Sequence, residues 1–161
     1  KYHQEVVWPA IETGLGTAGR SRTDRELSGG GIIMTRPDED TVMKNLEWVR
    51  NPESIYASTP AYRPVMELHG WEDLADKLLH MTKTGQWKKM AAEVPDDVLD
   101  EFCIYTTYDK LPEAIEGRFG GISDTVEIGF EDDTDVEVAQ DVVSQVHAIA
   151  CGFEAPIDRY A

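Results

Sequence analysis

The chain has 161 residues, of which 41% are hydrophobic, and this is enough for one domain with a buried core. Its 31 acidic residues outnumber the 15 basic ones and give a formal net charge of −16, which repels nucleic acids and anionic membranes, so we expect neither as a partner. No apolar run is long enough to cross a membrane and no signal peptide is visible, so we expect a cytoplasmic protein. The two cysteines, Cys103 and Cys151, lie in apolar runs, and we expect both to be buried, reduced thiols.

The first predicted element is a helix over residues 2–18, which Pro9 should kink or restart. This helix leads into GLGTAG, residues 14–19, which has the glycine spacing of a dinucleotide-binding turn. Such a turn requires a strand before it and an amphipathic helix after it. Here a helix precedes the glycines, and the following RSRTDRELSGG has Leu27 as its one apolar residue. The glycines are therefore predicted to end a helix rather than to bind a nucleotide.

The next predicted elements are a strand and two helices. Residues 30–35 form a short apolar run suited to a buried strand. Asp38 then offers an N-cap to a second helix, which Pro52 should interrupt. A helical turn and a loop are expected to lead to a helix over residues 71–84, which Gly85 ends.

The last third of the chain is predicted to contain a strand–helix–strand unit. Residues 102–107 are rich in aromatic and β-branched side chains, and residues 125–130 form a similar run. Asp109 can cap the helix between them, and a right-handed crossover would make the two strands parallel. The sequence EDDTD, residues 131–135, is predicted to start a last helix.

Together these elements predict an α/β fold with about three parallel strands surrounded by helices. Three strands cannot close a barrel, and a complete (β/α)8 barrel takes about 250 residues. The order of the elements therefore predicts the C-terminal portion of a (β/α)8 TIM barrel over residues 1–161, with a helical insertion at about residues 51–101. Because the chain opens on a helix, we expect that the strands that precede it in such a barrel are missing.

The ends of the predicted strands carry the first candidate site, because the C-terminal ends of the strands form the active site of a (β/α)8 barrel. Thr106 and Thr107 end one strand close to the N-terminus of the next helix, where hydroxyl and N–H groups can cradle a phosphate. Thr35 ends the earlier strand and is a second candidate for such a cradle. The alternative is that these threonines only satisfy local backbone groups.

The second candidate region is the aromatic, hydroxyl-rich segment of residues 56–71, in the long connection between the first two strands. Such a connection is uncommon unless it forms a lid or a binding element, although its aromatic side chains could also only pack it onto the barrel. Its candidate substrate-side residues are Tyr56, Tyr62, Arg63 and His69. The four histidines of the chain show no metal-ligand spacing, so we predict no metal site.

Four segments of the chain resemble the C-terminal half of luciferase-like flavin or deazaflavin oxidoreductases, especially those that use coenzyme F-420. These segments cover most of residues 6–130. The more specific ones contain the aromatic segment, followed by a W-x-x-M helix and a PDD turn. The four segments are PAIETGLGTAGR, IYASTPAYRPVMELHGW, GQWKKMAAEVPDDVLDEF and YTTYDKLPEAIEGRFGGISDTVEI.

The resemblance implies a barrel of the bacterial-luciferase type, in which the present strands are the sixth to the eighth. It implies hydride transfer between F-420 and a small organic substrate, with the cofactor phosphate near Thr106 and Thr107, where the family usually has Gly-Thr. Residues 56–71 map onto the insertion that walls the substrate side. The family's usual catalytic residues lie in the N-terminal half, so no catalytic residue is assigned here, and the chain alone should be inactive.

Two alternatives to the F-420 hypothesis stay open. The first is an FMN-dependent luciferase-like monooxygenase, since some relatives use FMN and oxygen. The second is a non-catalytic half-barrel that acts as a binding or assembly module. The open edges of a partial sheet predict a homo-oligomer, or pairing with a missing N-terminal half.

Overall fold

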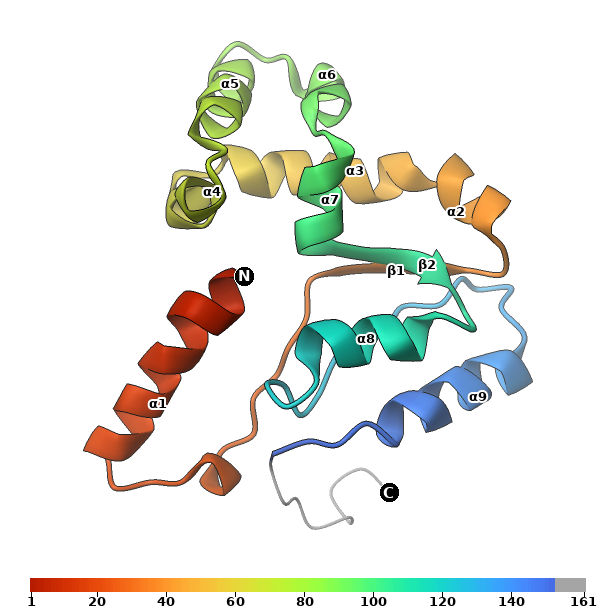
Figure 1. Ribbon diagram of the computed structural model, residues 1–161. Coiled ribbons are helices and arrows are strands. Elements are labelled where there is room, and N and C mark those ends of the chain that lie inside the picture. Colours follow the sequence, from red (N-terminus) through yellow and green to blue (C-terminus); the bar gives the residue numbers. More distant parts are fainter. Residues whose placement is uncertain (153–161) are drawn as a thin grey trace. The chain divides into compact units, whose positions relative to one another are not determined.

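The structure is a computed structural model that describes residues 1–152. Within this range the chain is mostly helical, with a two-stranded parallel sheet made of β1 (Ile32–Arg36) and β2 (Cys103–Thr107) (Figure 1). The predicted α/β class is therefore confirmed. None of the described helices is long and apolar enough to cross a membrane.

The chain divides into two compact units. We call residues 31–105 the central unit, and residues 1–30 together with the chain from residue 106 onward the terminal unit. Both strands lie in the central unit except for the last two residues of β2, Thr106 and Thr107, which belong to the terminal unit.

The terminal unit begins with a continuous helical segment. The π-helix η1 (His3–Val7) leads directly into α1 (Trp8–Thr17), where Pro9 occupies the second position. Proline lacks a backbone N–H, but the first turn of a helix does not use that donor, so the predicted restart at Pro9 is confirmed. A short 3-10 helix, η2 (Arg22–Asp24), follows in the loop.

The glycine-rich sequence GLGTAG forms the C-terminal end of α1. Gly14 and Gly16 lie inside the helix, and Gly19 follows it with a φ of +63°. The Gly19 N–H donates to the Gly16 carbonyl (3.2 Å), and the Arg20 N–H donates to the Leu15 carbonyl (2.9 Å). This pair of hydrogen bonds is the Schellman motif that ends many helices. The prediction that these glycines end a helix is confirmed.

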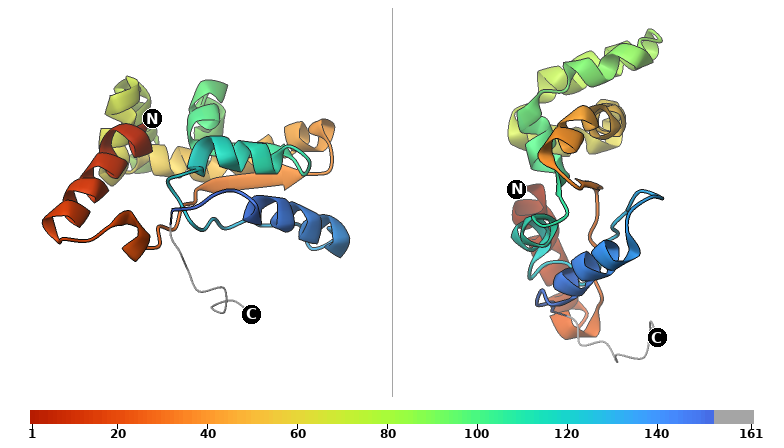
Figure 2. Two further views of the ribbon diagram at one scale, coloured as in Figure 1. Left: turned by 60° about the horizontal axis from the view of Figure 1, so that its bottom comes forward. Right: turned by 90° about the vertical axis from the view of Figure 1, so that its right-hand side faces the viewer.

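Two further helices complete the described part of the terminal unit, α8 (Leu111–Phe119) and α9 (Val136–His147). They run side by side in the same direction, as Figures 1 and 2 show from several sides. Four of their side chains are buried. These side chains are Leu111, Ile115, Phe119 and Val142.

The predicted third strand, residues 125–130, is not formed in the described part of the chain. Its first residue, Thr125, makes one isolated parallel bridge with Ser28, and the Gly29 N–H donates to the Thr125 carbonyl (2.8 Å). A strand needs a continuous hydrogen-bonded neighbour, and residues 27–29 offer only a short irregular one. The prediction of a strand over residues 125–130 is therefore wrong, because in the described residues these apolar and β-branched side chains have no neighbouring strand with which to pair.

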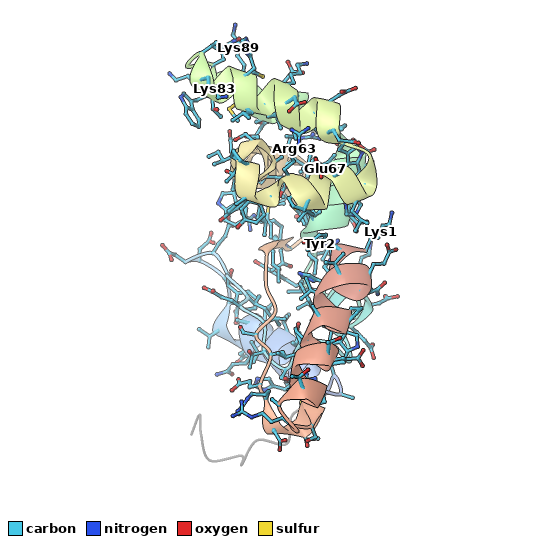
Figure 3. All side chains as sticks on the ribbon, turned by 90° about the vertical axis from the view of Figure 1, so that its left-hand side faces the viewer. Lys1, Tyr2, Arg63, Glu67, Lys83 and Lys89 are labelled. Carbon is cyan, nitrogen blue, oxygen red and sulfur yellow. The ribbon has the colours of Figure 1, made fainter. Side chains whose placement is uncertain are left out.

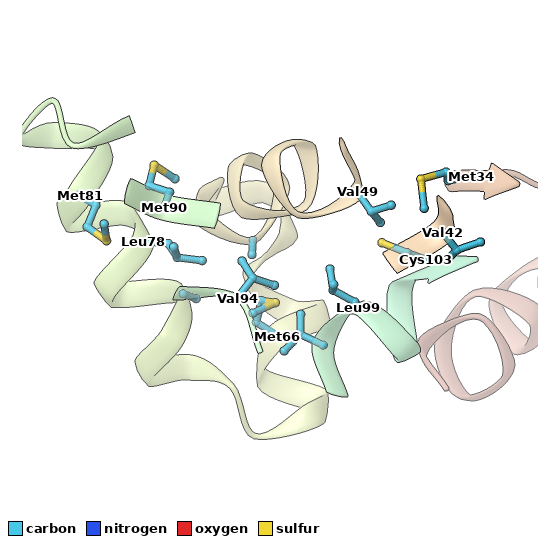
Figure 4. Close-up of a cluster of buried hydrophobic side chains, with 13 residues drawn as sticks. Met34, Val42, Val49, Met66, Leu78, Met81, Met90, Val94, Leu99 and Cys103 are labelled. Carbon is cyan, nitrogen blue, oxygen red and sulfur yellow. The ribbon is translucent and has the colours of Figure 1, made fainter. Parts of the chain in front are cut away.

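The central unit is a cluster of helices on one two-stranded sheet. The core is formed mainly by α3, α5 and α7 with the strands, and its buried side chains are drawn in Figure 4. The helices are α2 (Glu39–Lys44), α3 (Leu46–Ser58), η3 (Pro60–Tyr62), α4 (Arg63–His69), α5 (Glu72–Lys83), α6 (Trp87–Met90), η4 (Ala91–Glu93) and α7 (Asp96–Phe102).

The predicted N-cap of α2 at Asp38 is confirmed, whereas the predicted interruption of the helix at Pro52 is not. The Asp38 carboxylate accepts a hydrogen bond from the Thr41 N–H (2.8 Å), as expected for an N-cap. Pro52 lies inside α3, so the predicted interruption there is wrong, and the break falls at Asn45. A proline in a helix costs about 3 kcal/mol. The burial of the α3 face on both sides of Pro52 offsets this cost.

The two cysteines differ in environment. Cys103 is buried in the central core, as predicted. Cys151 is exposed, so the prediction of a buried thiol is wrong at this position. It follows the end of α9 in a segment without a helix or a strand, where no packed face covers it.

Candidate functional site

The C-terminal end of β2 forms a rim of polar side chains in the terminal unit. Thr106 is partly buried and Thr107 is buried. The Thr107 hydroxyl lies outside ordinary hydrogen-bond geometry, yet it is near enough to the Asp109 carboxylate to lower the pKa of that carboxyl. The predicted cradle therefore contains one enclosed hydroxyl, and the Asp109 carboxylate competes with a ligand for it.

Tyr108 connects this rim to the segment that follows the predicted third strand. Its ring lies 6.1 Å from that of Phe130, and its hydroxyl lies 3.1 Å from the Thr134 hydroxyl. The structure thus brings together two segments of the terminal unit that the barrel hypothesis places at the ends of successive strands. Sequence analysis missed Tyr108, which directly follows a predicted strand, and Thr134, which lies four residues beyond the end of another.

The N-terminus of α8 differs from its prediction. The N-cap residue is Lys110, which makes no side-chain cap, so the predicted cap by Asp109 is wrong. Instead, a turn that includes a hydrogen bond from the Lys110 N–H to the Thr107 carbonyl (3.2 Å) separates the strand from the helix. Pro112 lies in the first turn and removes one N–H donor. Binding of an anion at this place would therefore depend more on hydroxyl groups and on the Lys110 ammonium than on the N–H groups of the helix.

Thr35 lies at the end of β1, in the central unit. Its side chain is fully buried, and within the described residues its hydroxyl oxygen has no hydrogen-bond partner. An unsatisfied buried hydroxyl costs about 1–3 kcal/mol, so such a group calls for an explanation. A water molecule or a polar ligand atom would satisfy it.

Two of the predicted substrate-side residues lie together on the surface of the central unit. The rings of Tyr56 and Tyr62 meet edge to face with centroids 5.4 Å apart, and about half of each side chain is exposed. Arg63 is held by carboxylates on two helices: it donates to Glu67 (2.9 Å) and also to Asp76 (Figure 3). The Asp76 hydrogen bond, and then the one to Glu67, raise the pKa of Arg63.

His69 is enclosed by aromatic rings in the central unit. It stacks on Trp71 with centroids 4.8 Å apart, and the edge of Phe102 lies against it at 5.3 Å. Its Nδ1 lies 2.7 Å from the Val65 carbonyl oxygen, and its Nε2 lies 3.0 Å from a Glu101 carboxylate oxygen. Both ring nitrogens therefore lie within hydrogen-bond distance of oxygen atoms. The structure uses His69 to join α4 to α7.

Glu53 is a chemically unusual group that sequence analysis missed. Its side chain is 6% exposed in the core of the central unit, with a carboxylate oxygen 4.0 Å from the Cys103 sulfur. Burial raises the pKa of Glu53 to about 7. Its spacing was a signal, because it lies four residues from both Val49 and Ala57, which are buried on the same helix face.

Within residues 1–152, the His, Cys, Asp and Glu side chains form no group of three that could hold a metal ion. The polar groups described above are distributed over both units. Thr106, Thr107 and Tyr108 lie in the terminal unit, and the Thr35 hydroxyl lies in the central unit. The aromatic and charged group of residues 56–71 lies wholly within the central unit.

Comparison with known proteins identifies relatives of this chain. A family described as luciferase-like monooxygenase matches residues 1–122. The chain is 34% identical over 126 residues to Uncharacterized protein Mb1395 of Mycobacterium bovis and equally to Uncharacterized protein Rv1360 of Mycobacterium tuberculosis. The match covers 78% of this chain and 37% of each relative, so the chain spans little more than a third of their length. No solved structure matches the chain significantly.

Proposed function

This chain belongs to the luciferase-like monooxygenase family, and we propose that it is the C-terminal segment of a cytoplasmic oxidoreductase that transfers a hydride between F-420 and a small organic substrate. The family match over residues 1–122 is the observation that carries the proposal. The resemblance of four segments to F-420-dependent proteins favours F-420 over FMN. Catalysis would require the N-terminal half of a barrel, with which this segment would pair.

The residues at the end of β2 fit the phosphate end of such a cofactor. The buried hydroxyl of Thr107, the hydroxyl of Thr106 and the Lys110 ammonium would hold a phosphate, and Tyr108 would keep the rim in place through Thr134. The unsatisfied Thr35 hydroxyl is a further donor for a polar ligand atom. F-420, when bound, supplies the carbon that accepts or gives up the hydride.

The substrate would lie against the segment of residues 56–71. Tyr56 and Tyr62 offer an exposed aromatic wall, which suits a small organic molecule. Arg63 and His69 are already held by carboxylates of other helices, Asp76 and Glu101, so the tyrosines are the better candidates for contact with the substrate.

Titration of the purified chain with F-420 and with FMN, followed by the fluorescence of each cofactor, tests the proposal. We expect F-420 to bind more tightly than FMN. Preferential binding of FMN would overturn the F-420 assignment in favour of a monooxygenase. Binding of neither cofactor, by the chain alone and after addition of the N-terminal half of a family member, would favour the non-catalytic half-barrel.

A substitution in the cradle tests the site separately from the cofactor. Thr107→Val keeps the shape of the side chain and removes the hydroxyl, so we expect about tenfold weaker F-420 binding, the effect of one lost hydrogen bond to a charged group. Thr84→Val, an exposed threonine after α5, is the matched control and should bind like the wild type. Equal affinities for all three proteins would remove Thr107 from the site.

A further inference from the structure

A short segment of the central unit reverses the charge of the rest of the chain. Residues 77–92 contain four lysines and no aspartate or glutamate, although 31 of the 161 residues of the chain are acidic. The segment includes the second half of α5, the turn after it and α6. We call residues 83–89 the lysine turn, and its lysines are Lys83, Lys88 and Lys89. A local excess of positive charge on an acidic protein marks a place where an anionic partner can approach.

Hydrogen bonds order the lysine turn. Gly85 has a left-handed backbone with a φ of +72°, and the Gln86 N–H donates to the Met81 carbonyl (2.9 Å). The side-chain amide of Gln86 donates to the Thr84 hydroxyl (2.9 Å). On either side of the turn, Met81 and Met90 are buried in the central core. The lysines therefore project from a fixed backbone, and a partner does not have to order it on binding.

The three lysines of the turn are exposed, and in the part of the chain that the structure describes their side chains make no hydrogen bond or ion pair. Arg50, Arg63 and Lys77 of the same unit each bind a carboxylate instead. Lys83 and Lys89 lie at the same end of the unit (Figure 3). Ammonium groups so close in the chain repel one another, and carboxylates of a partner would relieve this repulsion.

Trp87 adds an apolar group to the lysine turn. It is the first residue of α6, and it is 53% exposed. Tryptophan is enriched among the residues that supply most of the energy of protein interfaces. Its ring has an apolar face, and its indole N–H can donate to a carboxylate. The turn therefore combines cationic and apolar contacts, and this combination matches an acidic segment that contains a large apolar side chain.

We propose that the lysine turn is a docking surface for a short acidic segment of a partner protein. Carboxylates of that segment would pair with Lys83, Lys88 and Lys89, and an aromatic or large apolar side chain between them would lie against Trp87. Docking here does not depend on the proposed cofactor, because the cradle residues 106–110 belong to the terminal unit.

The charge of the whole chain favours a short protein segment over a nucleic acid or an anionic membrane. Both of these are larger than the turn, so they would also meet the acidic surface beyond it, and repulsion acts over a Debye length of about 8 Å at physiological ionic strength. A short segment can be bound within the turn alone. Exposed ion pairs are weak and are screened by salt, so the complex should be transient and should dissociate in high salt.

Fluorescence anisotropy of a labelled peptide tests the proposal. The probe is fluorescein-labelled Asp-Glu-Phe-Asp-Asp-Glu, titrated with the whole chain at low salt. We expect saturable binding, which Lys83→Gln combined with Lys88→Gln weakens about tenfold, the product of two exposed ion pairs of about threefold each. Trp87→Ala should weaken binding about fivefold through the lost aromatic contact. Arg20→Gln combined with Lys44→Gln is the matched control, because it removes the same charge from exposed positions outside the turn and should leave the affinity nearly unchanged.

Three outcomes would overturn the proposal, once circular dichroism has shown that each variant is folded. Equal weakening by both double variants would mean that only the net charge matters. Equal binding of a peptide with Asn and Gln in place of its acidic residues would mean that the turn does not recognise carboxylates. A short DNA duplex, or vesicles that contain phosphatidylglycerol, could also bind more tightly than the peptide and depend on the same lysines, which would assign the turn to a nucleic acid or a membrane instead.

Discussion

Glu53 shows how the fold changes the chemistry of a single residue. A glutamate carboxyl has an ordinary pKa of 4.5, and burial in the central unit raises it to about 7. Because the folded state holds this proton more tightly than the unfolded state, the protonated carboxyl stabilises the fold at low pH. That contribution is lost as the pH rises from 4.5 to 7, since the unfolded chain releases the proton first.

Replacement of Glu53 by glutamine should therefore stabilise the protein at alkaline pH. At pH 8 we expect Glu53→Gln to raise the free energy of unfolding by up to about 3 kcal/mol, because the charged form no longer has to be buried. At pH 5 the two proteins should differ by about 1 kcal/mol or less. Urea unfolding followed by circular dichroism at both pH values measures the difference. Glu47→Gln, an exposed site on the same helix, should show no such pH dependence, and a parallel response of both variants would contradict the burial argument.

At the scale of one helix, the glycines of GLGTAG are expected to respond in opposite directions to the same substitution. Gly14 lies inside α1 with open space around its Cα, so Gly14→Ala should stabilise the helix by about 0.5–1 kcal/mol. Gly19 has a left-handed backbone with a φ of +63°, so Gly19→Ala should cost about 1 kcal/mol. Thermal unfolding of both variants measures the two shifts, and a shift of the same sign for both would contradict the assignment of Gly19 to the helix end.

Between elements, Asp124 joins several loops of the terminal unit. Its carboxylate, with a side chain 3% exposed, accepts hydrogen bonds from the Arg22 guanidinium (2.7 and 2.8 Å), the Leu27 N–H (2.7 Å) and the Gly152 N–H (2.9 Å). Arg22 in turn lies over the Trp8 ring, with its guanidinium carbon 5.7 Å from the ring centroid. One carboxylate therefore holds together segments that are about 100 residues apart in the sequence.

Asp124→Asn should destabilise the protein by about 3 kcal/mol, because it leaves the charge of Arg22 without its buried partner. The neutral amide can still accept from one of the backbone N–H groups, so the fold should survive at low temperature. The melting temperature, followed by circular dichroism, measures the loss. Asp133→Asn removes a carboxylate at an exposed position, so it controls for the change in net charge. An equal loss in both variants would show that the Asp124 contacts add no stability.

For the molecule as a whole, local patterns predicted the elements better than their pairing. Helical spacing located α1 and α5, and the left-handed Gly19 and Gly85 end these helices as expected. The strand over residues 125–130 was wrong because strand formation depends on a neighbour that is distant in the sequence. The helix through Pro52 was missed because burial of α3 outweighs a local penalty. The place of Thr107 at a strand end was predicted and is confirmed, whereas the contact of Tyr108 with Thr134 required the fold.

The net charge of −16 is a property of the whole chain, and it predicts how salt affects stability. Like charges repel one another more strongly in the compact state, and salt screens this repulsion. At pH 7.5 we therefore expect NaCl, raised from about 0.05 M to about 1 M, to increase the melting temperature by about 5 °C, or roughly 1–2 kcal/mol for a chain of this size. Measurements at low micromolar protein concentration keep any self-association out of the result. Near pH 4.5, which is the isoelectric point, the repulsion is absent and the same increase in salt should have little effect. A similar rise at both pH values would mean that salt acts on burial of apolar surface and not on charge repulsion.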